Sequence, residues 1–246
     1  MKVQIGLVKY GSSYSYGEIR AVLEKTFPDA HIFILNNQSE AAEKGEIQGS
    51  NSGHEFSGYY ELLQLMDNSQ PIVLFNDTLF KNHMTLGWLW LVKRCLKGLE
   101  NHNHMIFGDL RFDGDDLPER PNPFLASWVF LLSGSVAVEE MHRTLANLLE
   151  NPQPTWSLAY EVFLNEWLLS QKWYKGWHQK AVNSEILKLK KRNIYWEHCL
   201  SKALLENDGL TVYSLGHENA LIYQTLRVLD RLKTGISRSL ALIQRR

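Results

Sequence analysis

The sequence has few cysteines, no long apolar run and almost no net charge, and each shortage excludes a class of protein. Two cysteines in 246 residues, Cys95 and Cys199, lack the spacing of a zinc site and are too few for a disulfide framework. A net charge of −1 provides no overall field that would attract nucleic acid. We therefore expect no nucleic-acid partner, and the scarcity of cysteine fits a reducing compartment.

Membrane-spanning and secretory segments are also missing from the sequence. A spanning helix needs roughly 20 consecutive apolar residues, and the longest candidate, residues 125–138, is interrupted by Ser133-Gly134-Ser135. The apolar run at residues 3–8 is too short for a signal peptide and has no small-residue cleavage site after it. We therefore expect a soluble cytoplasmic protein.

Apolar periodicity predicts alternating strands and helices in the first half of the chain. Hydrophobic residues make up 44% of the sequence, enough to bury a full core. The opening strand–helix–strand order indicates a βαβ unit and a parallel sheet. Strands are expected at residues 3–8, 31–35, 71–75, 105–108 and 124–132, and helices at 16–27, 56–66, 84–99, 136–149, 156–167, 195–206 and 219–246. The predicted class is α/β, with a mainly helical C-terminal region.

The clearest strand, residues 71–75, runs directly into Asn76-Asp77-Thr78. In open α/β sheets, ligands bind just beyond the carboxyl ends of strands, so polar side chains at this junction are candidates for a site. The same three residue types favour turns and helix N-caps, which is the plain structural alternative.

Five motifs appear in an order that resembles inverting GT-A glycosyltransferases, particularly the rhamnosyltransferase-like and polysaccharide-synthesis relatives. The resemblance spans roughly residues 3–209. Two positions depart from the family pattern, because Asn36 and Asn76 stand where the family usually has aspartate. The motifs are Tyr10 after the first strand, Asn36-Asn37-Gln38-Ser39 after the second, the glycine-containing loop from Gly49 to Gly58, Asn76-Asp77-Thr78, and Glu197-His198-Cys199-Leu200-Ser201. The stretch Ser127-Trp128-Val129-Phe130-Leu131-Leu132 also resembles the acceptor-side strand of the family.

The resemblance implies a GT-A-like fold, a mostly parallel sheet flanked by helices, and a hexosyltransferase-type reaction. A sugar would pass, with inversion, from a UDP- or dTDP-linked donor to a glycan or lipid-linked acceptor in surface polysaccharide biosynthesis. Asp77 would hold a divalent metal, Mg²⁺ or Mn²⁺, against the donor diphosphate. Glu197 would be the general base, a role that its expected position at the start of a helix also favours electrostatically.

Further roles follow from the resemblance, each with a plain alternative. Trp128 could stack on a sugar ring or fill the core. His217 could be a late metal ligand or a surface residue, and Glu55 could contact sugar hydroxyls or form a surface ion pair. The expected donor-binding residues are Tyr10, Asn37, Asn51, Gly53, Glu55, Asn76 and Thr78.

The C-terminal stretch, residues 217–246, is expected to be an amphipathic helical extension outside a catalytic domain at residues 1–216. Its basic face could rest on an anionic membrane surface, dock onto the domain or contact a partner subunit. Two rival functions remain. One is a non-catalytic GT-A-like binding or scaffolding protein, and the other is a Rossmann-like methyltransferase, disfavoured because no Gly-x-Gly-x-x-Gly turn follows the first strand.

Overall fold

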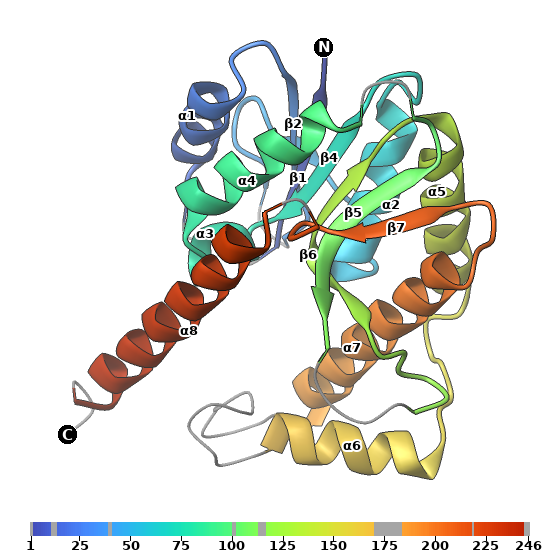
Figure 1. Ribbon diagram of the computed structural model, residues 1–246. Helices are drawn as coiled ribbons and strands as arrows, with labels where there is room; N and C mark the ends of the chain where they lie inside the picture. Colours follow the sequence, from blue (N-terminus) through green and yellow to red (C-terminus); the bar gives the residue numbers. More distant parts are fainter. Residues whose placement is uncertain are drawn as a thin grey trace.

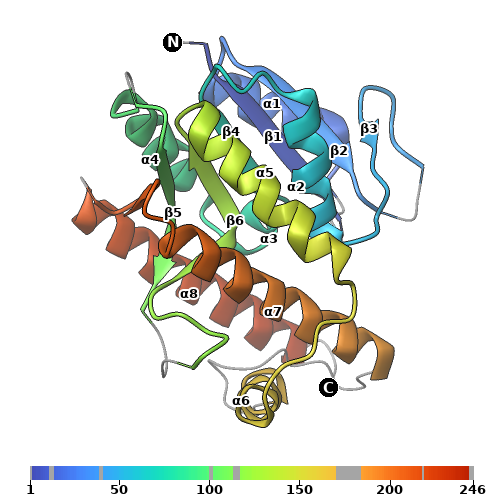
Figure 2. The same ribbon diagram turned by 90° about the vertical axis from the view of Figure 1, so that its right-hand side faces the viewer.

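A seven-stranded mixed sheet with helices on both faces forms the centre of the computed structural model (Figures 1 and 2). The structure describes residues 2–10, 14–38, 41–99, 102–112, 117–169, 184–217 and 219–243. The strand order is β3-β2-β1-β4-β6-β5-β7. The strands are β1 (Gln4–Lys9), β2 (His31–Asn36), β3 (Ile47–Gln48), β4 (Ile72–Asn76), β5 (Met105–Arg111), β6 (Phe124–Leu132) and β7 (Thr211–Ser214).

The sheet is mostly parallel, and β6 is the exception. Strands β1 to β4 pair in parallel, as do β5 and β7, whereas β6 runs antiparallel to both β4 and β5. Consequently the N-terminal end of β6 lies at the same edge of the sheet as the carboxyl ends of β1 and β4. The expected α/β class with a mostly parallel sheet is confirmed.

The helices cover the sheet in two layers, each with its own apolar core. One layer holds α1 (Tyr16–Thr26), α4 (Thr85–Lys97) and α8 (Ala220–Ile243), and the other holds α2 (His54–Leu65), α5 (Ser135–Glu150) and α7 (Ser184–Leu205). The short helix α3 (Thr78–Asn82) follows β4 directly and adds Leu79 and Phe80 to the first core, whereas α6 (Leu158–Leu169) packs against α7 in a separate apolar cluster. No helix in the described part of the chain is long and apolar enough to cross a membrane.

Helix α8 does not stand apart from the domain. Tyr223 and Leu226 are 4% and 7% exposed and join the core shared with α1 and α4. Asp230 accepts hydrogen bonds from Trp88 Nε1 (2.7 Å) and the backbone N–H of Met84 (2.6 Å). The expected boundary at residue 216 therefore does not separate the first half of α8 from the domain. Its C-terminal half extends away from the sheet (Figure 1).

One irregularity interrupts the antiparallel pairing of β5 and β6. Gly108 pairs with Phe130, but the next residue, Asp109, pairs with Ala126. Ser127, Trp128 and Val129 therefore have no partner in register on β5. Such β-bulges locally re-aim side chains and are frequent next to functional sites.

Candidate functional site

The candidate site lies at the edge of the sheet where β1 and β4 end and β6 begins. Tyr10 follows β1, Asp77 follows β4, and Ser127 is in the first half of β6. Glu55 reaches the same place from the first turn of α2, and Glu197 reaches it from α7. Segments that are far apart in the sequence are thereby brought together at a sheet edge where ligands bind in open α/β folds.

The side chain of Asn76 holds the turn after β4 in place. Its Oδ1 accepts from the backbone N–H of Thr78 (3.0 Å), and its Nδ2 donates to the Ser127 carbonyl (3.3 Å). The Thr78 hydroxyl lies 3.1 Å from the hydroxyl of Tyr10. Hydrogen bonds thus join the turn to β6 and to Tyr10 after β1. Both polar atoms of the Asn76 side chain are used in bonds within the protein.

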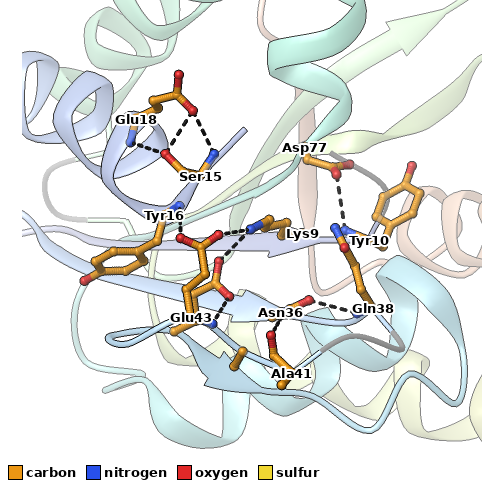
Figure 3. Close-up of polar contacts among 12 residues, drawn as sticks. Lys9, Tyr10, Ser15, Tyr16, Glu18, Asn36, Gln38, Ala41, Glu43 and Asp77 are labelled. Carbon is orange, nitrogen blue, oxygen red and sulfur yellow. Dashed lines mark hydrogen bonds and ion pairs between the residues drawn. The ribbon is translucent and has the colours of Figure 1, made fainter. Parts of the chain in front are cut away.

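Asp77 is fully buried and has two partners on one carboxylate oxygen. Oδ2 accepts from the backbone N–H of Tyr10 at 3.2 Å, a contact visible in Figure 3, and lies 3.0 Å from Nζ of Lys81. The Lys81 ammonium also lies 5.0 Å from the centre of the Tyr10 ring, within the range of a cation–π contact. The cation that faces Asp77 is therefore Lys81, which lies one helical turn later in α3.

Glu55 is a buried carboxylate with one oxygen unused. The residue is 7% exposed; Oε1 accepts from the Ser127 hydroxyl (3.4 Å), and Oε2 has no hydrogen-bond partner among the described residues. Burial raises the pKa of Glu55; Lys190 opposes this, and the negative charges of Glu197 and Asp77 add to it. A carboxyl group in this state is suited to proton transfer or to binding a hydroxyl.

Glu197 contacts the backbone of the same residue, Ser127. Its Oε1 accepts from the backbone N–H of Ser127 at 2.6 Å. Helix α7 begins at Ser184, so Glu197 lies in its second half rather than at its N-terminus. The expected favourable position at a helix start is wrong, because the basic cluster at residues 188–192 belongs to the helix instead of preceding it.

Two tyrosines, Tyr59 and Tyr10, lie close to the carboxylates of the site. Tyr59 donates to the Ser127 carbonyl (2.6 Å). Burial raises the pKa of Tyr59 and Tyr10 well above the ordinary value, and the charge of Glu55 adds to both shifts. Both phenols therefore stay protonated. Tyr59 was not expected from the sequence because it falls on the apolar face of α2, where only its hydroxyl signals a polar partner.

Asn37 organises the loop before α2 instead of facing the site. It is 1% exposed; Oδ1 accepts from the backbone N–H of Asn51 (2.6 Å), and Nδ2 donates to Ser57 Oγ (3.0 Å) and to the His54 carbonyl. Gly53 is closely packed, because a Cβ there would lie 2.6 Å from Leu149 Cδ2 and 3.2 Å from Trp196 Cζ3. Asn37, Asn51 and Gly53 were all predicted to bind the donor, and of these three only Asn51 is exposed.

The loop that follows β2 is fastened to β1 by a buried lysine. Lys9 Nζ lies 2.8 Å from Glu43 (Figure 3) and 3.0 Å from Glu46. Glu43 also accepts from the backbone N–H of Tyr16 at the start of α1 (3.1 Å). These ion pairs fix the rim of the sheet beside Tyr10.

Trp128 lies on the opposite face of the sheet from Glu55. It is 3% exposed, its ring stacks on His83 at 4.0 Å between centroids, and its Nε1 donates to Asp109 (2.8 Å). The indole is therefore a core residue in this structure and does not offer a face to a sugar.

His217 lies at the far end of the same sheet edge. It is exposed after β7, which is three strand positions from β4, or roughly 14 Å at the usual strand spacing. The structure does not bring His217 to Asp77.

The residues around Asp77 do not fit a divalent cation. Both polar atoms of the Asn76 side chain bond within the protein, Asp77 is paired with Lys81, and His217 is distant. Among the described residues, no group of three or more His, Cys, Asp or Glu side chains is placed to hold a metal ion. Proteins usually hold Mg²⁺ through one or two carboxylates together with substrate phosphates, and here the Asp77 carboxylate is buried and paired with Lys81.

No protein-family model, curated protein or solved structure matches the chain. The function must therefore be inferred from the site itself.

Proposed function

We propose that the chain is a nucleotide-sugar-dependent glycosyltransferase with a GT-A-like domain. It would transfer a sugar from a UDP- or dTDP-linked donor to a hydroxyl of a glycan or lipid-linked acceptor, with inversion at the anomeric carbon. One observation carries the proposal: Glu55 and Glu197 converge on Ser127 beside the Asn76-Asp77-Thr78 turn. Two carboxyl groups at the ligand-binding edge of an α/β sheet supply acid–base chemistry where a nucleotide would bind.

In this proposal Glu197 is the general base. It takes the proton of the acceptor hydroxyl while the acceptor oxygen attacks the anomeric carbon and the nucleoside diphosphate leaves. The hydrogen bond from the Ser127 N–H to Oε1 holds the Glu197 carboxylate in a fixed orientation. Orientation of this kind matters because a base must lie within hydrogen-bond reach of the proton that it removes.

Glu55 has a different role in the same proposal. Its raised pKa and its unbonded Oε2 fit a group that binds a sugar hydroxyl, either by accepting a hydrogen bond or, when protonated, by donating one. The environments of Glu55 and Glu197 differ, which is a common feature of carboxyl pairs with separate roles.

The setting in surface polysaccharide biosynthesis rests on the sequence resemblance alone. The sheet order, with one antiparallel strand between β4 and β5, is compatible with a GT-A-like domain. The positions of Tyr10 after β1 and of the Asn76-Asp77-Thr78 turn after β4 also agree with the motif order on which the resemblance depends.

A second candidate is a GT-A-like protein that binds a ligand without catalysis. The observation in its favour is that Asn37 and Asn76, both expected to contact the donor, are committed to hydrogen bonds within the protein. A binding or scaffolding protein would keep the ligand-binding edge of the sheet and lack turnover.

Thermal-shift titration with UDP, dTDP, GDP and ADP tests the proposal, because a ligand that binds the folded state raises the apparent melting temperature. We expect UDP or dTDP to raise it and the purine nucleotides to have less effect. Slow hydrolysis of the corresponding nucleotide sugar in the absence of acceptor should then release nucleoside diphosphate. Binding without any release would favour the non-catalytic candidate, and no stabilisation by any nucleoside diphosphate would refute both.

A further inference from the structure

We propose that the ammonium group of Lys81, and not a divalent cation, neutralises the donor diphosphate at the Asp77 turn. The inference rests on the proposed function and concerns how the donor is held. It predicts a glycosyltransferase whose donor binding does not depend on a metal ion, with a lysine as the cation.

The two charged groups of the Asp77–Lys81 pair differ in their exposure to solvent. The Asp77 side chain is 0% exposed, whereas that of Lys81 is 30% exposed, and the two charged groups lie 3.0 Å apart. Lys81 is therefore the accessible member of the pair. A ligand arriving at the end of β4 meets the lysine before the buried carboxylate, and a metal ion that bound Oδ2 of Asp77 would compete with Lys81.

The Lys81 ammonium has hydrogen-bonding capacity left for an anion. It carries three donors, and within the described residues its partners are one carboxylate, Asp77, and the face of the Tyr10 ring. Donors therefore remain for phosphate oxygens. Asp77 and Tyr10 fix the position of the ammonium, so that little freedom is lost when an anion binds.

Arg192 and Lys190 on α7 place further positive charge near His54 and Glu55. His54, at the start of α2, has its pKa lowered by burial and then by the positive charges of Arg192 and Lys190 on α7. Arg192 lies 4.5 Å from the Trp196 ring centre, and its Nε has no hydrogen-bond partner among the described residues. A diphosphate carries two negative charges or more, and cations on α3 and α7 could contact it from two sides.

The Lys81 and metal hypotheses predict opposite effects of Asp77→Asn. If Asp77 held a metal, the asparagine would remove a ligand and metal-dependent binding would be lost. If Asp77 only orients Lys81, the asparagine still accepts from the Tyr10 N–H and leaves the ammonium charge uncompensated. Binding of the diphosphate should then be retained or strengthened.

The experiment measures UDP and dTDP affinity by calorimetry, in EDTA and in Mg²⁺ or Mn²⁺, for wild type, Lys81→Met, Lys81→Arg, Asp77→Asn and Lys188→Met. Lys188 is the matched control because it is exposed on α7 and paired with Glu185. We expect equal wild-type affinity with and without metal. Lys81→Met should weaken binding roughly tenfold or more, the loss expected for a charged hydrogen bond. Lys81→Arg should restore most of this affinity, and Lys188→Met should change nothing.

The alternative results are distinct. Binding that requires metal and is lost in Asp77→Asn would overturn the inference and leave the proposed function intact. Binding that is unchanged in Lys81→Met, with an unaltered melting temperature, would also overturn it. No binding of either nucleotide under any condition would reject the proposed function and the inference together.

Discussion

The hydroxyl of Tyr223 on α8 donates a 2.6 Å hydrogen bond to Oδ1 of Asp109 at the end of β5, 114 residues earlier in the chain. Asp109 also accepts from Trp128 Nε1 and forms an ion pair with Arg111. One buried carboxylate thus joins the C-terminal helix to two strands of the sheet. The N-terminal half of α8 is consequently part of the domain that supports the site.

We predict that truncation after Gly216 unfolds or strongly destabilises the protein. The truncation removes Tyr223, Leu226 and Asp230 from the core, and replacing a single buried leucine such as Leu226 with alanine already costs about 2–5 kcal/mol. Truncation after Thr234 keeps these three contacts and serves as the control, which should stay folded. Urea unfolding of both variants measures the effect, and a stable, cooperative chain ending at Gly216 would contradict it.

Asp109 should make the protein sensitive to strong acid. Burial raises its pKa, but Arg111, Tyr223 and Trp128 more than offset this and lower the pKa from 3.8 to about 2. The folded state thus holds the proton more weakly than the unfolded state. The stabilisation, about 2 kcal/mol, is fully present above the unfolded pKa and is lost as the pH falls through about 2.

The test compares Asp109→Asn with Asp29→Asn, which changes an exposed aspartate. Chemical unfolding at neutral pH and between pH 4 and pH 2 should show that Asp109→Asn is the less stable variant at neutral pH. The difference from wild type should shrink toward pH 2. A constant difference across the whole range would show that the carboxylate charge is not the cause.

Glu55→Gln should stabilise the protein at neutral pH while weakening its activity. Burial raises the pKa of Glu55, so the folded state binds the proton more tightly than the unfolded state. Stability is therefore lost as the pH rises through the raised pKa. Glutamine keeps the shape, can still accept from the Ser127 hydroxyl, and removes this cost.

The melting temperature of Glu55→Gln should exceed that of wild type at pH 7 and approach it in acid. Each kcal/mol corresponds to roughly 2–4 °C for a chain of this size. Glu150→Gln is the control because Glu150 is exposed at the end of α5. A variant that melted lower than wild type at every pH would show that the carboxylate is structurally required.

Glu197→Gln should abolish most transfer and leave folding intact. Glutamine Oε1 can still accept from the Ser127 N–H but cannot take a proton, so hydrolysis or transfer should fall by roughly 10²-fold or more. Nucleotide affinity and melting temperature should change little. Release of nucleoside diphosphate is the measurement, with Glu185→Gln on the same helix as the control. Near-normal turnover in Glu197→Gln would remove it as the base.

The strands that form the middle of the sheet were predictable because they are fully buried. β1, β4 and β6 read as continuous apolar runs, and their observed bounds differ from the predicted ones by at most one residue at either end. β7 is half-buried along its length and β3 has two residues, so neither has a distinct apolar pattern. The amphipathic pattern of α8 predicts a helix, but the surface that it packs against is decided by the fold.

The site was predictable where a motif follows a strand and less so where helices contribute. Tyr10 and Asn76-Asp77-Thr78 were located from strand ends, and the structure brings Glu55 and Glu197 to them through Ser127. Lys81 was missed because its role depends on a one-turn spacing from Asp77 in a short helix that the sequence does not signal. The roles of Trp128 and His217 followed from the resemblance, but the bulge in β6 and the strand order decide where they lie.

The bulge in β6 releases three residues from β5 but not from the rest of the domain. Ser127, Trp128 and Val129 have no partner in register on β5, yet Val129 pairs with Phe75 on β4 and Trp128 is buried in the core. A deletion of the three residues would bring Ala126 and Phe130 into register with β5 and would take away the serine that Glu55 and Glu197 contact. The same deletion would remove a strand pairing and a buried tryptophan. The candidate site and the stability of the sheet are therefore coupled within this one strand.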